Sequence, residues 1–330
     1  MTPATDIYPP AGLNTFLSKH GWGGAAVTLV AADASFRRYF RATAEDGRKA
    51  VLMDAPPPHE DPKPFIDIAR YLVAHGFRAP EIFAQDLEHG LVLLEDFGDL
   101  QMRQHLDVAP VDADMIYRTA IDALVRLAAT PVAQLPRYDE PTYLREVNLL
   151  SEWYMPAMGL DFDQSEYEDL WRAALMPIAD IQSVTVLRDY HAENIMLLPG
   201  GEQGIIDFQD ALIGHPAYDL VSLLQDARRD VDPALEQAML SYYRDATSAD
   251  ADFDLHYALL GAQRNTKIIG IFTRLWKRDG KERYLSFLPR MWGLLERDLA
   301  HPGLAELKQW FDRYVPVDVR AQAPDRVAAE

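Results

Sequence analysis

Residues 187–208 read LRDYHAENIMLLPGGEQGIIDF, and this stretch decides the fold. Two apolar runs flank the segment Pro-Gly-Gly-Glu-Gln, whose proline and glycines favour a tight turn, so the pattern predicts a β-hairpin. Folding the chain about this turn places Asn194 and Asp207 near each other at the open end. Asp189 lies on the loop that enters the first strand. The stretch therefore predicts that three oxygen-bearing side chains converge.

Converging carboxylate and amide oxygens suit a hard cation such as Mg²⁺, which takes its remaining ligands from water and phosphate groups. Phosphoryl transfer requires little more than this. It needs neutralisation of the phosphate charge and one carboxylate that orients the attacking hydroxyl and accepts its proton.

The order Asp-x-x-x-x-Asn, hairpin, hydrophobic-Asp-Phe resembles the catalytic and metal-binding loops of protein kinases and their small-molecule relatives. A histidine two residues after the aspartate, His191 here, makes this version more similar to the aminoglycoside and choline phosphotransferases. The resemblance implies that ATP and Mg²⁺ are the cofactors. It also implies that Asp189 is the catalytic base and that Asn194 and Asp207 hold the metal.

The remaining sequence agrees with such a fold. Alternating or continuous apolar patterns predict five short strands, at 27–30, 36–42, 49–53, 81–85 and 91–95, and a helix at 64–75. Helical periodicity then dominates, at 115–129, 143–155, 166–179, 218–228, 233–245, 255–278 and 288–299. The prediction is an α+β, protein-kinase-like two-lobed fold. A small antiparallel β-rich N-lobe covers 1–98, and a large helical C-lobe covers 99–330 with the catalytic loop, the metal hairpin and the acceptor site.

Four further segments narrow the resemblance: DASFRRYFR at 33–41, LMDAPP at 52–57, DFQDA at 207–211 and GIFTRL at 270–275. Together they are similar to the bacterial anomeric kinases of N-acetylmuramate and N-acetylglucosamine. In that group ATP phosphorylates the anomeric hydroxyl of the sugar during recycling of cell-wall fragments. A kinase of aminoglycosides or of another cationic, choline-like alcohol remains the alternative.

The nucleotide site departs from the family pattern. The segment LLEDFG at 93–98 resembles the hinge, which implies that Glu95 and Phe97 lie beside adenine. The strand that usually supplies a phosphate-binding lysine has Met53 instead. The nearest substitute cation is Arg37 or Arg38, beside the turn at Ser35 between the first two strands, so Ser35, Arg37 and Arg38 are the candidates for contacts with the nucleotide. For each arginine, an exposed position on an edge strand is the alternative.

Four other residues leave alternatives open. Leu187 stands where relatives usually carry an orienting histidine, so a catalytically weak, nucleotide-binding pseudokinase is a second alternative. Asp219 either braces the catalytic loop, as the resemblance implies, or stabilises the first turn of its own helix.

Arg264 and Lys267 are the candidate acceptor ligands, because a cation could pair with the lactyl carboxylate of a muramic sugar. Solvated surface charge is the alternative for both.

Composition limits the partners. Lys and Arg total 32 against 51 Asp and Glu, for a net charge of -19, which disfavours nucleic acid. The acidity is compatible with a cationic substrate but is also common for solubility alone. There is no cysteine, so thiolate metal sites are excluded. No leader pattern and no membrane-length apolar run is found, so the expected location is the cytoplasm and the expected partner is a small-molecule acceptor.

Overall fold

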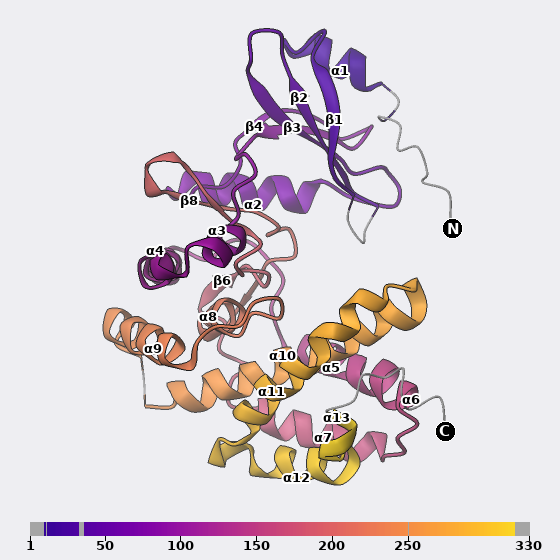
Figure 1. Ribbon diagram of the computed structural model, residues 1–330, viewed down its shortest axis with the longest axis vertical. Helices are drawn as coiled ribbons and strands as arrows, with labels where there is room; N and C mark the ends of the chain where they lie inside the picture. The colour runs from indigo at the N-terminus through magenta and orange to yellow at the C-terminus, as the bar shows by residue number, and fades with distance from the viewer. Residues whose placement is uncertain (1–9, 11, 33–35, 250, 321–330) are drawn as a thin grey trace. The chain divides into compact units, whose positions relative to one another are not determined.

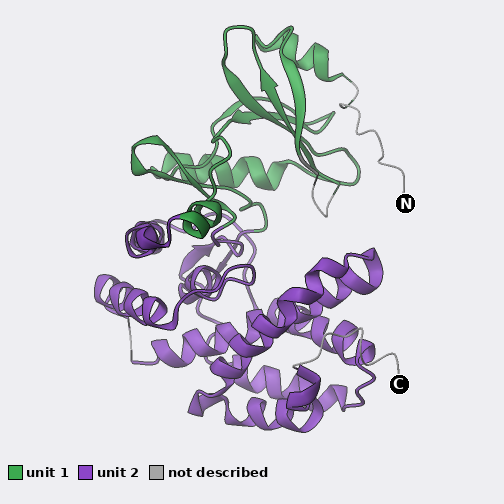
Figure 2. Cartoon of the chain, in the orientation of Figure 1, with its two compact units in different colours: residues 1–108, 193–210 green, residues 109–192, 211–330 purple. Residues whose placement is uncertain are grey.

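Figure 1 shows the computed structural model, which describes residues 10, 12–32, 36–249 and 251–320. Two compact units are present (Figure 2). The first is Met1–Val108 with Glu193–Asp210, and the second is Ala109–Ala192 with Ala211–Glu330. The sequence-based division ended the first lobe at residue 98 and placed the hairpin in the C-lobe. The compact units differ from it, since the hairpin groups with the N-terminal residues.

The first unit contains a five-stranded antiparallel sheet in the order β1-β2-β3-β5-β4. Its strands are β1 Ala26–Ala32, β2 Arg38–Thr43, β3 Lys49–Asp54, β4 Ile82–Asp86 and β5 Leu91–Glu95. All five predicted strands are confirmed. Leu91, Val92, Leu93 and Leu94 are almost completely buried, as expected for a strand covered on both faces.

Short helices complete the hydrophobic core of this unit. Helix α1 (Leu13–Lys19) contributes Leu13, Phe16 and Leu17, which cluster with Phe40 and Leu52 of the sheet. Helix α2 (Lys63–Ala74) buries the apolar face that its sequence predicts. Helix α3 (Met102–Val108) was not predicted.

The second unit is mainly helical, as predicted (Figure 1). Its principal helices are α4 Ala113–Ala128, α5 Glu140–Leu149, α7 Gln164–Leu175, α8 Ala217–Leu224, α9 Pro233–Thr247, α10 Phe253–Asp279, α11 Leu288–Leu299 and α12 Ala305–Tyr314. Short helical elements lie at Pro110–Asp112, Met155–Ala157, Glu282–Phe287, Pro302–Leu304 and Val317–Arg320. A two-stranded antiparallel ribbon, β6 (Val184–Val186) with β9 (Leu212–Gly214), was not predicted.

Helix α10 forms the centre of this unit and packs against α5, α8 and α11. The single helix predicted at 143–155 is interrupted by a π-helical turn at Leu150–Tyr154. Gly270 of α10 lies directly on the backbone there, because an added Cβ would be 2.3 Å from the carbonyl carbon of Leu149. Only glycine permits this close approach of the two helices. Within the described ranges, no helix combines the length and the apolar character needed to cross a bilayer.

Candidate active site

The predicted hairpin is confirmed within the first unit. Strand β7 (Ile195–Leu197) pairs antiparallel with β8 (Gln203–Ile205), and the turn Pro199–Gly201 joins them. Gly200 and Gly201 have φ values of 86° and 85°, which explains the two glycines at the turn. The pairing continues one step further, since the Ile206 N–H donates to the Asn194 carbonyl at 3.0 Å.

The open end of the hairpin brings Asn194 and Asp207 together, as expected. The Asn194 amide donates to Asp207 Oδ2 at 3.2 Å, and Gln209 donates to the other carboxylate oxygen at 2.8 Å. Asp207 has a left-handed backbone, with φ 61°. The next residue, Phe208, is fully buried and stacks on Phe65 of α2 at 4.9 Å, so packing fixes the backbone that carries the carboxylate.

A carboxylate and an amide at hydrogen-bond distance are oxygen donors of the kind that Mg²⁺ uses together with water and phosphate oxygens. Among the described residues, no three His, Cys, Asp or Glu side chains form a ready-made metal cage. The donor set therefore fits a cation that takes most of its ligands from a bound phosphate and from water.

Asp189 belongs to the second unit, on the loop between β6 and β7. The loop is tightly turned, since the Asp189 N–H donates to the Leu187 carbonyl at 2.9 Å and the His191 N–H donates to the Asp189 carbonyl at 3.1 Å. Arg188 has a φ of 72°, which is strained for a residue with a side chain. Such a conformation persists only where surrounding groups hold it.

Asp219 of α8 supplies that support. Its carboxylate accepts the N–H of Leu187 at 2.7 Å and that of Arg188 at 2.8 Å. It also lies in the first turn of α8, but its two oxygens bind the loop, which supports the prediction that Asp219 braces the catalytic loop. Burial raises the pKa of Asp219 to about 7, against the opposing effect of these two hydrogen bonds. Leu187, which replaces the usual histidine, is almost fully buried.

Arg264 of α10 supports the same loop indirectly, through Ser222 of α8. Its side chain is only 4% exposed and donates to Ser222 Oγ at 2.9 Å, and Ser222 in turn donates to the Arg188 carbonyl at 3.2 Å. The sequence placed Arg264 at the acceptor, or alternatively at the surface. The structure instead shows it buried against α8 and the loop, which no helical periodicity could have indicated.

Lys267 lies one turn further along α10 and is mostly buried. Its ammonium is 3.0 Å from Glu146 Oε1 of α5 and donates to the Tyr218 hydroxyl at 3.3 Å. Glu146 also pairs with Arg188. Glu146 was not among the predicted residues, although the sequence carries a signal for it: it is a charged residue on the apolar face of its helix, in line with Tyr143 and Leu150.

The candidate phosphate-binding residues are held by acids of the first unit. Arg38 faces Asp54 across β2 and β3 and donates to it at 2.8 Å, and Arg37 forms an ion pair with Glu60 at 3.4 Å. Met53 is completely buried, and its uncharged thioether cannot take the place of a strand lysine. Ser35 lies outside the described residues.

The hinge candidates pack against the hairpin. Arg78 pairs with Glu95 at 2.8 Å and lies over the Phe97 ring at 5.2 Å. Phe97 in turn covers Gly204, where an added Cβ would be 2.5 Å from the ring. The Glu95 N–H donates to the Glu81 carbonyl at 2.8 Å, so the backbone of Glu95 takes part in the sheet. Neither the role of Arg78 nor that of Gly204 was expected.

The hinge is also tied to the sheet by an arginine that the sequence analysis did not single out. Arg41 of β2 binds both carboxylate oxygens of Asp96, at 2.6 and 2.9 Å, and pairs with Asp99 at 3.0 Å. Burial raises the pKa of Asp96, but the hydrogen bonds from Arg41 and the Gly98 N–H, together with the charge of Arg41, lower it below the usual range.

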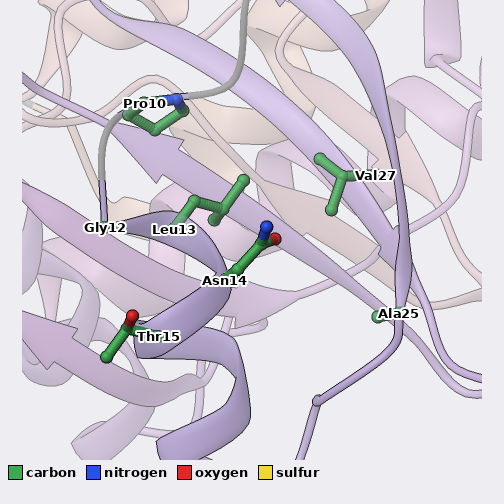
Figure 3. Close-up of a pocket in the computed structure, with 7 residues that line it drawn as sticks. All are labelled: Pro10, Gly12, Leu13, Asn14, Thr15, Ala25 and Val27. Carbon is green, nitrogen blue, oxygen red and sulfur yellow. The ribbon is translucent and has the colours of Figure 1, made fainter.

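A surface pocket of the first unit is distinct from these residues. Figure 3 shows it beside α1, lined by Pro10, Gly12, Leu13, Asn14, Thr15, Ala25 and Val27. None of the candidate catalytic or metal-binding residues lines it. We therefore assign it no part in the chemistry.

Comparison with known families decides the class of the protein. The model of the phosphotransferase enzyme family matches residues 26–254, which include the hairpin and the loop that carries Asp189. The chain belongs to the phosphotransferase enzyme family. As a member of this family it is a small-molecule kinase that transfers a phosphoryl group to a hydroxyl, and the predicted enzyme class is confirmed.

Individual relatives of this phosphotransferase are more specific. It is 37% identical to the N-acetylmuramate/N-acetylglucosamine kinase of Caulobacter vibrioides, over 92% of this chain and 96% of that protein. It is 39% identical to the kinase of the same name from Pseudomonas aeruginosa, over 87% of this chain and 89% of that protein. The resemblance inferred from four short segments is thus confirmed over most of the chain.

Solved structures support the fold. An amicoumacin kinase, hAmiN, aligns with a TM-score of 0.59 at 16% identity, covering 82% of this chain and 88% of its own. The choline kinase LicA of Streptococcus pneumoniae aligns with a TM-score of 0.58 at 14% identity, covering 84% and 94%. At such identities the likeness concerns the fold alone, and it confirms the predicted kinase-like architecture.

Proposed function

We propose that this phosphotransferase uses ATP to phosphorylate the anomeric hydroxyl of N-acetylmuramate or N-acetylglucosamine. The observation that carries the proposal is the similarity to four curated kinases of these two sugars, at 35% to 39% identity over 82% to 92% of this chain. The aminoglycoside and choline kinases resemble it only at the level of fold, at 13% to 16% identity.

In this proposal Asp189 acts on the sugar. Its carboxylate accepts the proton of the anomeric hydroxyl as the hydroxyl oxygen bonds to the γ-phosphorus and the bond to the leaving ADP breaks. A hemiacetal hydroxyl is more acidic than that of an ordinary alcohol, so it demands less of the base. A loop with Leu187 in place of the usual histidine is compatible with such an acceptor, because Asp219, Ser222 and Arg264 already hold the backbone.

Asn194 and Asp207 would hold Mg²⁺, with Asn194 presenting its amide oxygen. When bound, the metal would neutralise charge on the phosphate groups. The backbone at Asp96–Gly98 is the candidate for adenine recognition, supported by the contact of Phe97 with Gly204. Arg37, Arg38 and Ser35 remain the candidates for contacts with phosphate, and each arginine would first have to share or leave its carboxylate partner.

Identification of the product tests this function. The enzyme is incubated with ATP, Mg²⁺ and each of four acceptors: the two amino sugars, 1-O-methyl N-acetylglucosamine, and an aminoglycoside. Phosphorus NMR should show an acid-labile sugar 1-phosphate from the free sugars and no product from the methyl glycoside. Equal reaction of the methyl glycoside would refute the anomeric site, and reaction of the aminoglycoside alone would establish the alternative substrate class.

A further inference from the structure

Glu146 of α5 is a buried carboxylate that faces two cations. Its Oε1 pairs with the Arg188 guanidinium and, at 3.0 Å, with the Lys267 ammonium. Its Oε2 accepts hydrogen bonds from the Tyr138 hydroxyl and, at 3.1 Å, from the Gln263 amide. Burial would raise the pKa of Glu146, but Lys267 and Arg188 hold it at about 2, so the group is ionised. One negative charge therefore faces two positive charges.

The two cations lie on different elements of the second unit: Lys267 is on α10, and Arg188 is on the loop that follows β6. Lys267 extends from α10, which packs against α5 and α8 (Figure 1). Besides Glu146, its acceptor in the described part of the chain is the uncharged hydroxyl of Tyr218. An ammonium has three N–H donors, so one remains for a ligand. Lys267 and Arg188 keep 13% and 19% of their side-chain surface exposed.

The cluster adjoins the catalytic loop. Arg188 directly precedes Asp189 in the chain, and consecutive Cα atoms lie about 3.8 Å apart. Burial lowers the pKa of Arg188, whereas the charges of Glu146 and Asp189 are among the causes that raise it above its usual value. Arg188 is therefore a member both of the cluster and of the loop that carries Asp189. A ligand whose hydroxyl reaches Asp189 would have its other substituents close to the cluster.

We propose that Lys267 and Arg188, oriented by Glu146, form a subsite for an anionic substituent of the acceptor, and that this substituent is a carboxylate. The proposal rests on the proposed function and extends it. Of the two sugars in question, N-acetylmuramate carries a carboxylate on its lactyl ether and N-acetylglucosamine does not. Charge-assisted hydrogen bonds from a largely desolvated ammonium or guanidinium are strong, so the subsite would favour the sugar acid.

The experiment compares three acceptors: N-acetylmuramate, its methyl ester, and N-acetylglucosamine. KM and kcat are measured for each with the wild type and with Lys267→Met, which removes the charge and shortens the unbranched side chain by only one atom. For the variant we expect KM for N-acetylmuramate to rise by roughly tenfold to a hundredfold, the usual range for loss of a charge-assisted hydrogen bond. KM for the ester and for N-acetylglucosamine should change by less than about threefold, because neither has the anion.

Two matched variants separate charge from structure. Lys277→Met removes an exposed lysine of the same helix and should leave all three acceptors unchanged. Lys267→Arg keeps the charge and should keep the preference for the acid over its ester. Thermal melting of each variant shows whether it is folded.

The outcomes are distinct. Loss of the acid preference in Lys267→Met alone supports the subsite. Equal losses for all three acceptors would show that Lys267 is structural and would overturn it. If the wild type uses the acid and the ester equally well, the proposal is overturned without any variant. If the wild type phosphorylates neither amino sugar, the proposed function fails and the subsite fails with it.

Discussion

The carboxylate of Asp219 accepts the backbone N–H of Leu187 at 2.7 Å, so an acid on α8 determines the course of the loop that leads to Asp189. The same carboxylate accepts the next N–H along the chain, where the backbone has a φ of 72°. A strained loop of this kind depends on its supports.

Replacement of Asp219 by alanine should therefore impair both stability and turnover. Leaving two N–H groups without their acceptor costs about 1–3 kcal/mol for a buried group. We expect kcat to fall on the order of tenfold to a hundredfold through displacement of Asp189, with little change in KM for ATP. Steady-state kinetics measures kcat, and urea unfolding measures the free energy of unfolding. The control is Asp122→Ala, at an exposed aspartate of α4. Unchanged kcat would show that the loop is held by other contacts.

Asp189→Asn should reduce kcat by about a hundredfold to ten-thousandfold, the usual contribution of a general base. Affinity for the nucleotide should stay nearly constant, because the carboxylate acts on the acceptor. Turnover and calorimetric binding of an ATP analogue test the two statements. Asp180→Asn, an exposed aspartate of the same unit, serves as the comparison. Activity within a few fold of wild type would remove Asp189 from the mechanism.

Asp207→Ala should abolish the dependence of nucleotide binding on Mg²⁺, since the proposal gives this carboxylate a direct contact with the metal. Calorimetry with and without Mg²⁺ is the measurement. Glu88→Ala, at an exposed turn of the same unit, should retain the full metal effect. A variant at residue 207 that still binds ATP more tightly with Mg²⁺ would place the metal elsewhere.

The buried pair His215 and His256 predicts a pH effect on stability. His215 Nδ1 accepts the Ala217 N–H at 3.0 Å and its Nε2 lies 3.2 Å from His256, while burial lowers its pKa to about 3. Below pH 6.5, the usual pKa of histidine, His215 is protonated in the unfolded chain but stays neutral in the folded protein. The free energy of unfolding should therefore fall as the pH falls from 6.5 towards 3, by up to about 1.4 kcal/mol per pH unit.

His215→Asn isolates this contribution, because the asparagine oxygen can still accept the Ala217 N–H. Asp219 acts in the opposite sense: its raised pKa stabilises the protein at low pH, and this stabilisation is lost as the pH rises from about 4 to about 7. The informative quantity is thus the difference between wild type and variant in urea unfolding at pH 7, 6 and 5. Parallel curves would exclude His215 as the origin of the pH dependence.

Local signals determined which parts of the fold were predictable. The hairpin was predictable because its turn and its two apolar runs are contiguous, so Asn194 and Asp207 follow from counting along the strands. The ribbon of β6 and β9 was not, since each strand has three residues and the partners are far apart in sequence. Helix α12 was missed although Leu307, Trp310 and Phe311 give it an apolar face.

The side chains of the candidate site were harder to predict than the fold. Arg264 and Lys267 lie on α10, which is buried around most of its circumference, so periodicity cannot tell which cation faces the loop and which faces α5. The same holds for Arg38, whose partner Asp54 follows only from the register of two strands. Contacts of this kind depend on which helices and strands pack together, and the sequence around a single residue does not show that.

The discontinuity of the first unit has a consequence for synthesis. The Ile205 N–H donates to the Arg78 carbonyl at 2.7 Å, and the Leu197 N–H donates to the Leu100 carbonyl at 2.8 Å. A nascent chain that has emerged from the ribosome only as far as Val108 lacks both donors and leaves the face of Phe97 uncovered. The N-terminal unit can thus reach its final form only after residue 210 has been translated, and a gene fragment that stops at Val108 would encode an incomplete sheet-and-helix layer prone to aggregation.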